Sequence, residues 1–247
     1  MAFPHLEKAP IVEGLIDLRV RLANGFEPET LKELHGRIAD RYPTCLESST
    51  FQTQLEFNAQ RGAKHAFLRN VSGYRFESAD KRYVFQAQVG GFTLSRLRPY
   101  ETWELLFAEA KELWAHYTEV ARPESVTRVA TRYINRLELP VPLGDFDDYL
   151  TAAPKGPLGL PQSVSEFFAR VVVPEPQCGA SVILTQVLEP ADTTRGVLPV
   201  ILDIDVFKEE VFTPESEAAW NLLSKFRDLK NEAFFGSITE KAKELFR

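Results

Sequence analysis

Residues 11–22 read IVEGLIDLRVRL, and the stretch alternates apolar with charged positions. Ile16, Leu18 and Val20 share one side of an extended chain, whereas Asp17 and Arg19 lie on the other. A period of two is the signature of a β-strand with one buried face. The stretch therefore predicts a strand that packs through one side only.

The same alternation recurs along the chain. Short polar or glycine-containing connections at Asp80-Lys81 and Gly90-Gly91 are typical of hairpins, so neighbouring strands should run antiparallel. Further strands are predicted over residues 51–58, 74–78, 83–89, 92–97, 126–139, 166–173, 180–188 and 198–207.

Apolar residues at intervals of three and four predict helices. The clearest covers residues 100–120, a second opens at Thr213-Pro214, and a shorter one spans residues 28–41. We expect an α+β fold in which a largely antiparallel sheet carries two long helices on one face. Two β-α-sheet-α halves placed side by side are the form we favour, and one strongly curved sheet is the alternative.

Residues 141–162, rich in Pro, Gly and Asp, form the one internal boundary that composition indicates, with a short helix expected at 145–150. We place an N-terminal half at residues 1–140 and a C-terminal half at residues 163–247, sharing one core.

Charge is unevenly distributed over the 247 residues. The net charge of −6 divides into +2 for residues 1–136 and −8 for residues 137–247. Between Arg61 and Arg98 eight basic residues face two acidic ones, a local balance of +6. A basic patch attracts anions, so binding of nucleic acid through this region is one hypothesis.

Cys45 and Cys178 are far apart and match no disulfide framework, so both are predicted to be free thiols in a reducing compartment. The N-terminal residues show no signal-peptide pattern, and no apolar run is long enough for a bilayer. We expect a cytoplasmic protein without membrane contact.

We find no motif that names a reaction. Asp203 and Asp205 lie about 7 Å apart on one face of a strand and are weak candidates for Mg²⁺, although alternation alone would place them on a solvent face. We therefore expect no cofactor and assign no catalytic residue. A small-ligand or metal-dependent enzyme with its site between sheet and helices is an alternative hypothesis.

Arg128, Arg132 and Arg136 recur every four residues and share one face of a strand. Arginine binds phosphate or carboxylate through a planar fork, so the row is a candidate partner site. The competing interpretation pairs the row with glutamates of neighbouring strands, Glu56 and Glu77 among them. Outward amides would accompany the arginines at Gln52, Gln54, Gln86 and Gln88.

The leading hypothesis is a non-enzymatic binding or regulatory module that engages a macromolecule through this Arg- and Gln-rich sheet face. This hypothesis is preferred because it needs no catalytic group that the sequence lacks. A protein partner is favoured, and nucleic acid is the least favoured alternative. The oligomeric state stays open.

Three short stretches, at residues 9–20, 132–136 and 229–240, resemble a sporadically distributed family of uncharacterised prokaryotic proteins of about this length. The resemblance covers essentially the whole chain and implies no established activity, cofactor or catalytic residue. It leads us to expect a histidine near Lys230 or Asn231, where this sequence has none. That departure argues against a catalytic role for this position.

Overall fold

The computed structural model describes residues 3–4, 6–58, 62–157, 159–161 and 163–247, and between residues 51 and 68 it describes the backbone alone. In this part of the chain, nine strands form one antiparallel sheet in the order β2-β3-β4-β5-β1-β6-β9-β8-β7. The strands are β1 (Ile11–Arg21), β2 (Thr44–Asn58), β3 (Gly62–Glu77), β4 (Tyr83–Gln88), β5 (Gly91–Leu97), β6 (Ser125–Pro140), β7 (Phe168–Glu175), β8 (Ala180–Leu188) and β9 (Val197–Phe212). The α+β class and the antiparallel sheet are confirmed.

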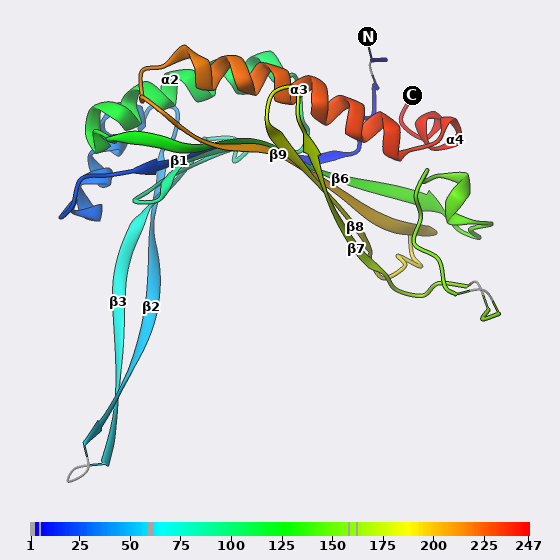
Figure 1. Ribbon diagram of the computed structural model, residues 1–247, viewed down its shortest axis with the longest axis horizontal. Coiled ribbons are helices and arrows are strands. Elements are labelled where there is room, and N and C mark those ends of the chain that lie inside the picture. The colour runs from blue at the N-terminus through cyan, green and yellow to red at the C-terminus, as the bar shows by residue number, and fades with distance from the viewer. Residues whose placement is uncertain (1–2, 5, 59–61, 158, 162) are drawn as a thin grey trace.

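The helices lie on one side of this sheet (Figure 1). They are α1 (His35–Ile38), α2 (Trp103–Ala121), α3 (Glu217–Ser237) and α4 (Glu240–Glu244), with 3₁₀ turns η1 (Pro28–Leu34) and η2 (Phe146–Asp148). Thr102 caps α2 and Ser216 caps α3 by accepting a backbone N–H, as these residue types do at helix starts. Among the described helices, none combines the length and apolarity needed to cross a membrane.

One hydrophobic core lies between the helices and the sheet. It includes Ile16 and Leu18 of β1, Phe92 of β5 and Trp114 of α2, and it continues to Phe226 of α3. Phe92 meets Trp114 edge-on with ring centroids 5.6 Å apart. The apolar positions of the alternation in residues 11–22 therefore lie on the face of β1 that the helices cover.

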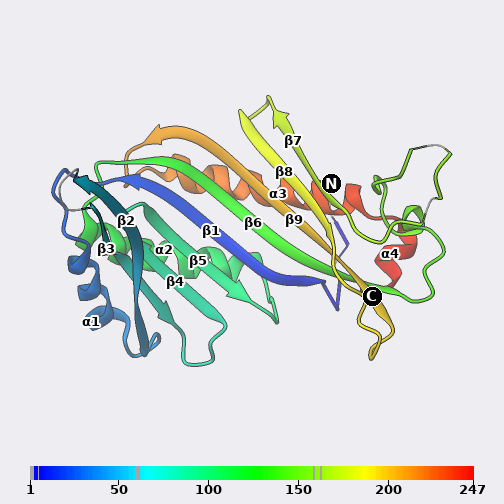
Figure 2. The same cartoon turned by 90° about the horizontal axis from the view of Figure 1, so that it is seen from below.

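The opposite side of the sheet, which we call the open face, carries no helix (Figure 2). A row of paired residues crosses it strand by strand, because register places every second residue on the same side. From β2 to β7 this row is Leu46, Arg75, Gln86, Thr93, Asp17, Ala130, Phe207, Ser181 and Pro174.

The hairpin of β2 and β3 extends far beyond the sheet as a two-stranded arm (Figure 1). β4 pairs with β3 only from Gly73 to Glu77, whereas β2 and β3 remain paired to Asn58 and Gly62. The arm leaves the sheet at a register shift next to Ser48. There Gly73 has φ +149°, and a Cβ on it would lie 2.1 Å from the Ala87 carbonyl oxygen.

Several expected boundaries were wrong. The predicted helix over residues 28–41 is a 3₁₀ turn followed by one α-helical turn, and the one over 145–150 shortens to η2. Residues 62–73, for which the sequence predicted no strand, belong to β3. Cys45 and Cys178 are free and half-buried.

Candidate functional site

Arg128 is the first member of the arginine row, and it lies on the open face of β6. Its guanidinium donates to Asp17 of β1 at 3.0 Å and to Asp205 of β9 at 2.9 Å. The same group lies over the Phe207 ring, 4.5 Å from its centroid, in a cation–π contact. Arg128 therefore ties three neighbouring strands together.

Arg132 and Arg136 are engaged in the same way. Arg132 donates from Nε to Asp203 at 2.8 Å and from Nη2 to the second oxygen of that carboxylate. Arg136 donates to Glu189 at 2.9 Å and also bonds Glu138. The row is paired as the competing interpretation proposed, but its partners are other acids than Glu56 and Glu77.

Glu77 itself bonds Arg75, and the side chain of Glu56 lies outside the described part of the chain. The acids that hold the row come from β1, β6, β9 and the segment after β8, which only the three-dimensional register brings together. The arginines thus form internal ion pairs across the sheet.

Asp203 and Asp205, the weak metal candidates, are two of these partners. Burial raises the pKa of Asp205, against the opposing effect of Arg128 and Arg132. Within the described residues, no group of three or more His, Cys, Asp or Glu side chains is placed to hold a metal ion. The role that the geometry gives both aspartates is to neutralise arginines.

Two of the four candidate glutamines have side chains within the described part of the chain. Gln86 and Gln88 lie half-buried on the open face of β4, 3.4 Å apart through their amides. Gln52 and Gln54 belong to the arm, where their side chains lie outside the described residues. For the described side chains, the amide-rich surface expected from the sequence is represented by the pair Gln86 and Gln88.

The basic region 61–98 is likewise divided between the two sides. Arg75 lies on the open face, whereas Arg96 is buried on the helix side, bonded to Glu101 at 2.6 Å and placed over the Tyr83 ring. Arg69 is bonded to Glu47. Outside the undescribed side chains of residues 61–68, the region forms no continuous basic patch.

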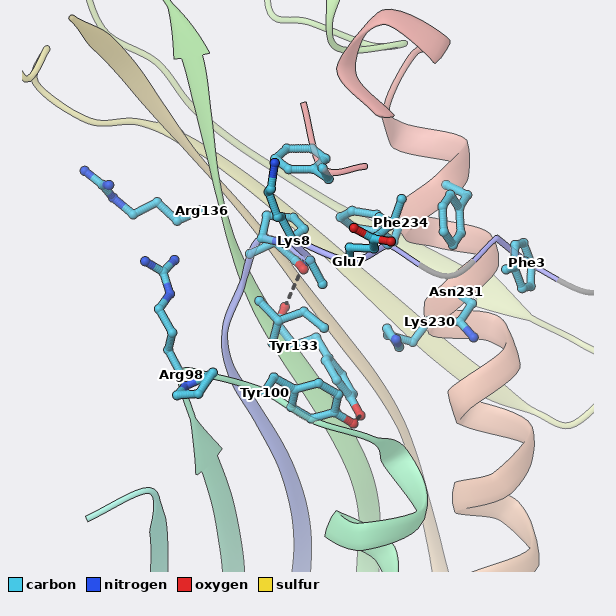
Figure 3. Close-up of a pocket in the computed structure, with 18 of the residues that line it drawn as sticks. Phe3, Glu7, Lys8, Arg98, Tyr100, Tyr133, Arg136, Lys230, Asn231 and Phe234 are labelled. Carbon is cyan, nitrogen blue, oxygen red and sulfur yellow. Dashed lines mark hydrogen bonds between the residues drawn. The ribbon is translucent and has the colours of Figure 1, made fainter. Parts of the chain in front are cut away.

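A pocket of about 880 Å³ lies on the helix side, and sequence patterns did not indicate it. Figure 3 shows its walls: the N-terminal segment, the connection from β5 to α2, the strand β6, and α3 with the C-terminal residues. Apolar and aromatic side chains line it together with charged ones, as in most small-molecule sites.

Two tyrosines form part of the pocket wall. The hydroxyls of Tyr100 and Tyr133 are 2.7 Å apart, and the rings meet edge-on with centroids 5.4 Å apart. Burial raises the pKa of both phenols, most strongly for the fully enclosed Tyr133. Both hydroxyls therefore keep their protons at neutral pH.

Lys230 of α3 enters the pocket above this pair (Figure 3). Its ammonium lies 4.0 Å from the centroid of the Tyr133 ring. Burial, together with the nearby charge of Arg227, lowers the pKa of Lys230 to about 8. Arg227 is itself paired with Glu104 of α2 at 3.0 Å.

Sequence reasoning singled out Lys230 and Asn231 only as a place where a histidine was expected. The pocket joins segments that are distant in sequence, and on α3 a lysine beside an asparagine resembles any solvent-facing pair.

Comparison of this chain with protein-family models, with curated proteins and with solved structures gives no match.

Proposed function

We propose that the protein is a non-enzymatic binding module that holds a protein partner against the open face of its sheet. The observation that carries this proposal is the one-sided arrangement of the fold. All four helices described above lie on one side, and the arm of β2 and β3 projects from the other (Figures 1 and 2). An occupant of the open face would thus meet the sheet and the arm together.

The charges of the open face favour a protein over nucleic acid. A nucleic-acid surface needs lysines and arginines that are free to replace counterions at phosphates. Here the arginines Arg128, Arg132 and Arg136 are already bonded to carboxylates of the same face. A face of mutually compensated charges suits the mixed polar surface of a protein.

Exposed apolar side chains mark both flanks of this face. Leu46 of β2 is 49% exposed, and Phe168 and Val172 of β7 are 70% and 48% exposed. Register places all three on the open side, at the two ends of the strand order. Exposed apolar groups rimmed by polar ones are typical of interaction surfaces.

The order of strands also supports two related halves. β5 returns to pair with β1 before α2, and β9 returns to pair with β6 before α3. The antiparallel neighbours β1 and β6 then form the junction between the halves. We infer that the open face offers a partner two similar half-surfaces side by side.

The experiment places a photoreactive phenylalanine analogue at Phe168 and, as a control, at Val171. Val171 is on the same strand and 55% exposed, but it faces the other side. A discrete protein adduct is expected from position 168 and not from position 171. The captured protein is then purified, and its affinity for Phe168→Asp, Leu46→Asp and Val171→Asp is measured.

The two open-face variants should weaken binding by about tenfold or more, since buried apolar anchors dominate interfaces, while Val171→Asp should not. Equal adducts from both positions, or equal affinities of the three variants, would refute the proposal. Salt-sensitive binding of a mixed-sequence duplex, abolished by substitutions on the open face, would favour the nucleic-acid alternative instead.

A further inference from the structure

The pocket between α3 and the sheet is separate from the open face. The geometry points to a site for a small organic anion, a carboxylate or a phosphate ester, that carries an apolar or aromatic portion. The inference rests on three features of the pocket: its charges, its free hydrogen-bond donors, and its apolar walls.

The cations of the pocket outnumber the carboxylates that are left to balance them. Of the four carboxylates in its lining, three are paired: Glu101 with Arg96, Glu104 with Arg227, and Glu138 with Arg195. Lys8, Arg98 and Lys230 also line the pocket, and among the described residues no carboxylate lies within ion-pair distance of them. Glu7 is the remaining acid.

Lys230 is the cation that most requires a counter-ion. Its ammonium is held over the Tyr133 ring at 4.0 Å, and the residue is only partly exposed to solvent. A partly buried charge without a partner is costly, and a bound anion would offset that cost. Burial and the charge of Arg227 also lower the pKa of Lys230, which shows that its charged form is disfavoured.

The tyrosine pair supplies a donor beside this lysine. Two hydroxyls carry two protons, and the single bond of 2.7 Å between Tyr100 and Tyr133 uses one of them. The second proton is available to an acceptor in the pocket. Asn231 lies on the same wall as Lys230 and carries a further amide (Figure 3).

The remaining walls are apolar. Leu6, Trp103, Phe234 and Phe246 are buried side chains that line the pocket. Phe3 extends this wall by stacking on Phe235, with centroids 5.1 Å apart. Such walls would bury the body of a ligand while the cations hold its charged end. An inorganic anion would leave them unused.

The test compares a charged probe with an uncharged probe of similar shape. 8-Anilinonaphthalene-1-sulfonate is an amphipathic anion, and N-phenyl-1-naphthylamine lacks the charge. Fluorescence titrations are run with the wild type, Lys230→Met, Lys230→Arg and Lys225→Met. Lys225 is an exposed lysine of the same helix outside the pocket, so it is the matched control.

Lys230→Met should weaken binding of the anionic probe by about tenfold or more, because a charge-assisted contact is lost. Lys230→Arg should retain most of the affinity, Lys225→Met should match the wild type, and the uncharged probe should be insensitive to Lys230→Met. Octanoate and phenyl phosphate, added as competitors, distinguish carboxylate from phosphate ligands.

Three results would overturn the inference: equal affinity of the anionic probe for wild type and Lys230→Met, equal loss with the uncharged probe, or displacement by inorganic phosphate as effective as by either organic competitor. Circular dichroism and thermal melts of each variant establish that it is folded. Because the open face is untouched by these substitutions, the outcome is independent of the proposed protein partner.

Discussion

Arg132 of β6 and Asp203 of β9 are joined by two hydrogen bonds, one of them 2.8 Å from Nε to the carboxylate, across the middle of the open face. The Asp203 side chain is 14% exposed and that of Arg132 is 44% exposed. The hydrogen bonds to Asp203 raise the pKa of Arg132 despite partial burial. Removing the arginine would therefore leave a mostly buried carboxylate without its counter-charge.

Arg132→Ala should lower the free energy of unfolding by about 1–2 kcal/mol, less than for a fully buried pair because solvent screens the arginine. Arg170→Ala, an exposed arginine of β7 on the same face, is the control and should change stability by no more than about 0.5 kcal/mol. Denaturant titrations measure both. If the two variants lose equally little unfolding free energy, Arg132 does not stabilise the fold. The arginine row would then again be a candidate partner site.

Gly73 marks the point where the arm leaves the sheet. Its φ of +149° disfavours other residues, and an added Cβ would lie 2.1 Å from the backbone oxygen of Ala87. Gly73→Ala should therefore cost about 2 kcal/mol or more. Gly36→Ala is the matched control, because nothing lies within 4 Å of its Cβ position, and it should be neutral or slightly stabilising. Similar unfolding free energies for the two would contradict a strained junction.

The sheet was largely predictable because alternation is local. Ile16 and Leu18 face the core and Asp17 and Arg19 do not, and that pattern is complete within one strand. The arm was predictable only in part. Alternation over residues 51–58 predicted one of its strands, whereas residues 62–73 of β3 were not predicted as a strand. Beyond Gly73 the two strands pair only with each other.

The candidate sites were harder to predict from the sequence than the sheet, because they depend on pairing between distant strands. Arg128 was correctly placed on one face with Arg132, but its partners Asp17 and Asp205 lie more than seventy residues away in sequence. Local spacing cannot identify such partners. The pocket presents the same difficulty, since Tyr100, Tyr133 and Lys230 come from three separate elements.

The Tyr100–Tyr133 bond allows a test by double-mutant cycle. Tyr133→Phe and Tyr100→Phe should each lower the free energy of unfolding by about 1 kcal/mol, because each removes the same hydrogen bond of 2.7 Å. The double variant should cost little more than either single one, since the bond can be lost only once. Additive losses, measured by denaturant unfolding, would show that the two hydroxyls are not coupled.

Lys230 lies over the ring of Tyr133, and the charge of Arg227 on the same helix acts on it. Arg227 is itself paired with Glu104 of α2. Burial and Arg227 lower the pKa of Lys230 to about 8, compared with 10.5 for an ordinary lysine. Below pH 8 both the folded and the unfolded chain bind this proton, and the folded state carries the full cost of the enclosed charge. Between about pH 8 and 10.5 the unfolded chain binds more protons, so this group makes stability rise with pH.

Lys230→Met should therefore stabilise the ligand-free protein at pH 7, on the order of 2 kcal/mol, and the advantage should shrink as pH rises through that window. Melts of wild type, Lys230→Met and the control Lys225→Met at pH values from neutral to alkaline measure it, and Lys225→Met should follow the wild type throughout. A Lys230→Met variant that is less stable than wild type at pH 7 would mean that the ammonium is already well satisfied in the free protein. If Lys230→Met is more stable than wild type, the ammonium of Lys230 destabilises the free protein. Such a cost to stability is expected where a binding site requires the charge.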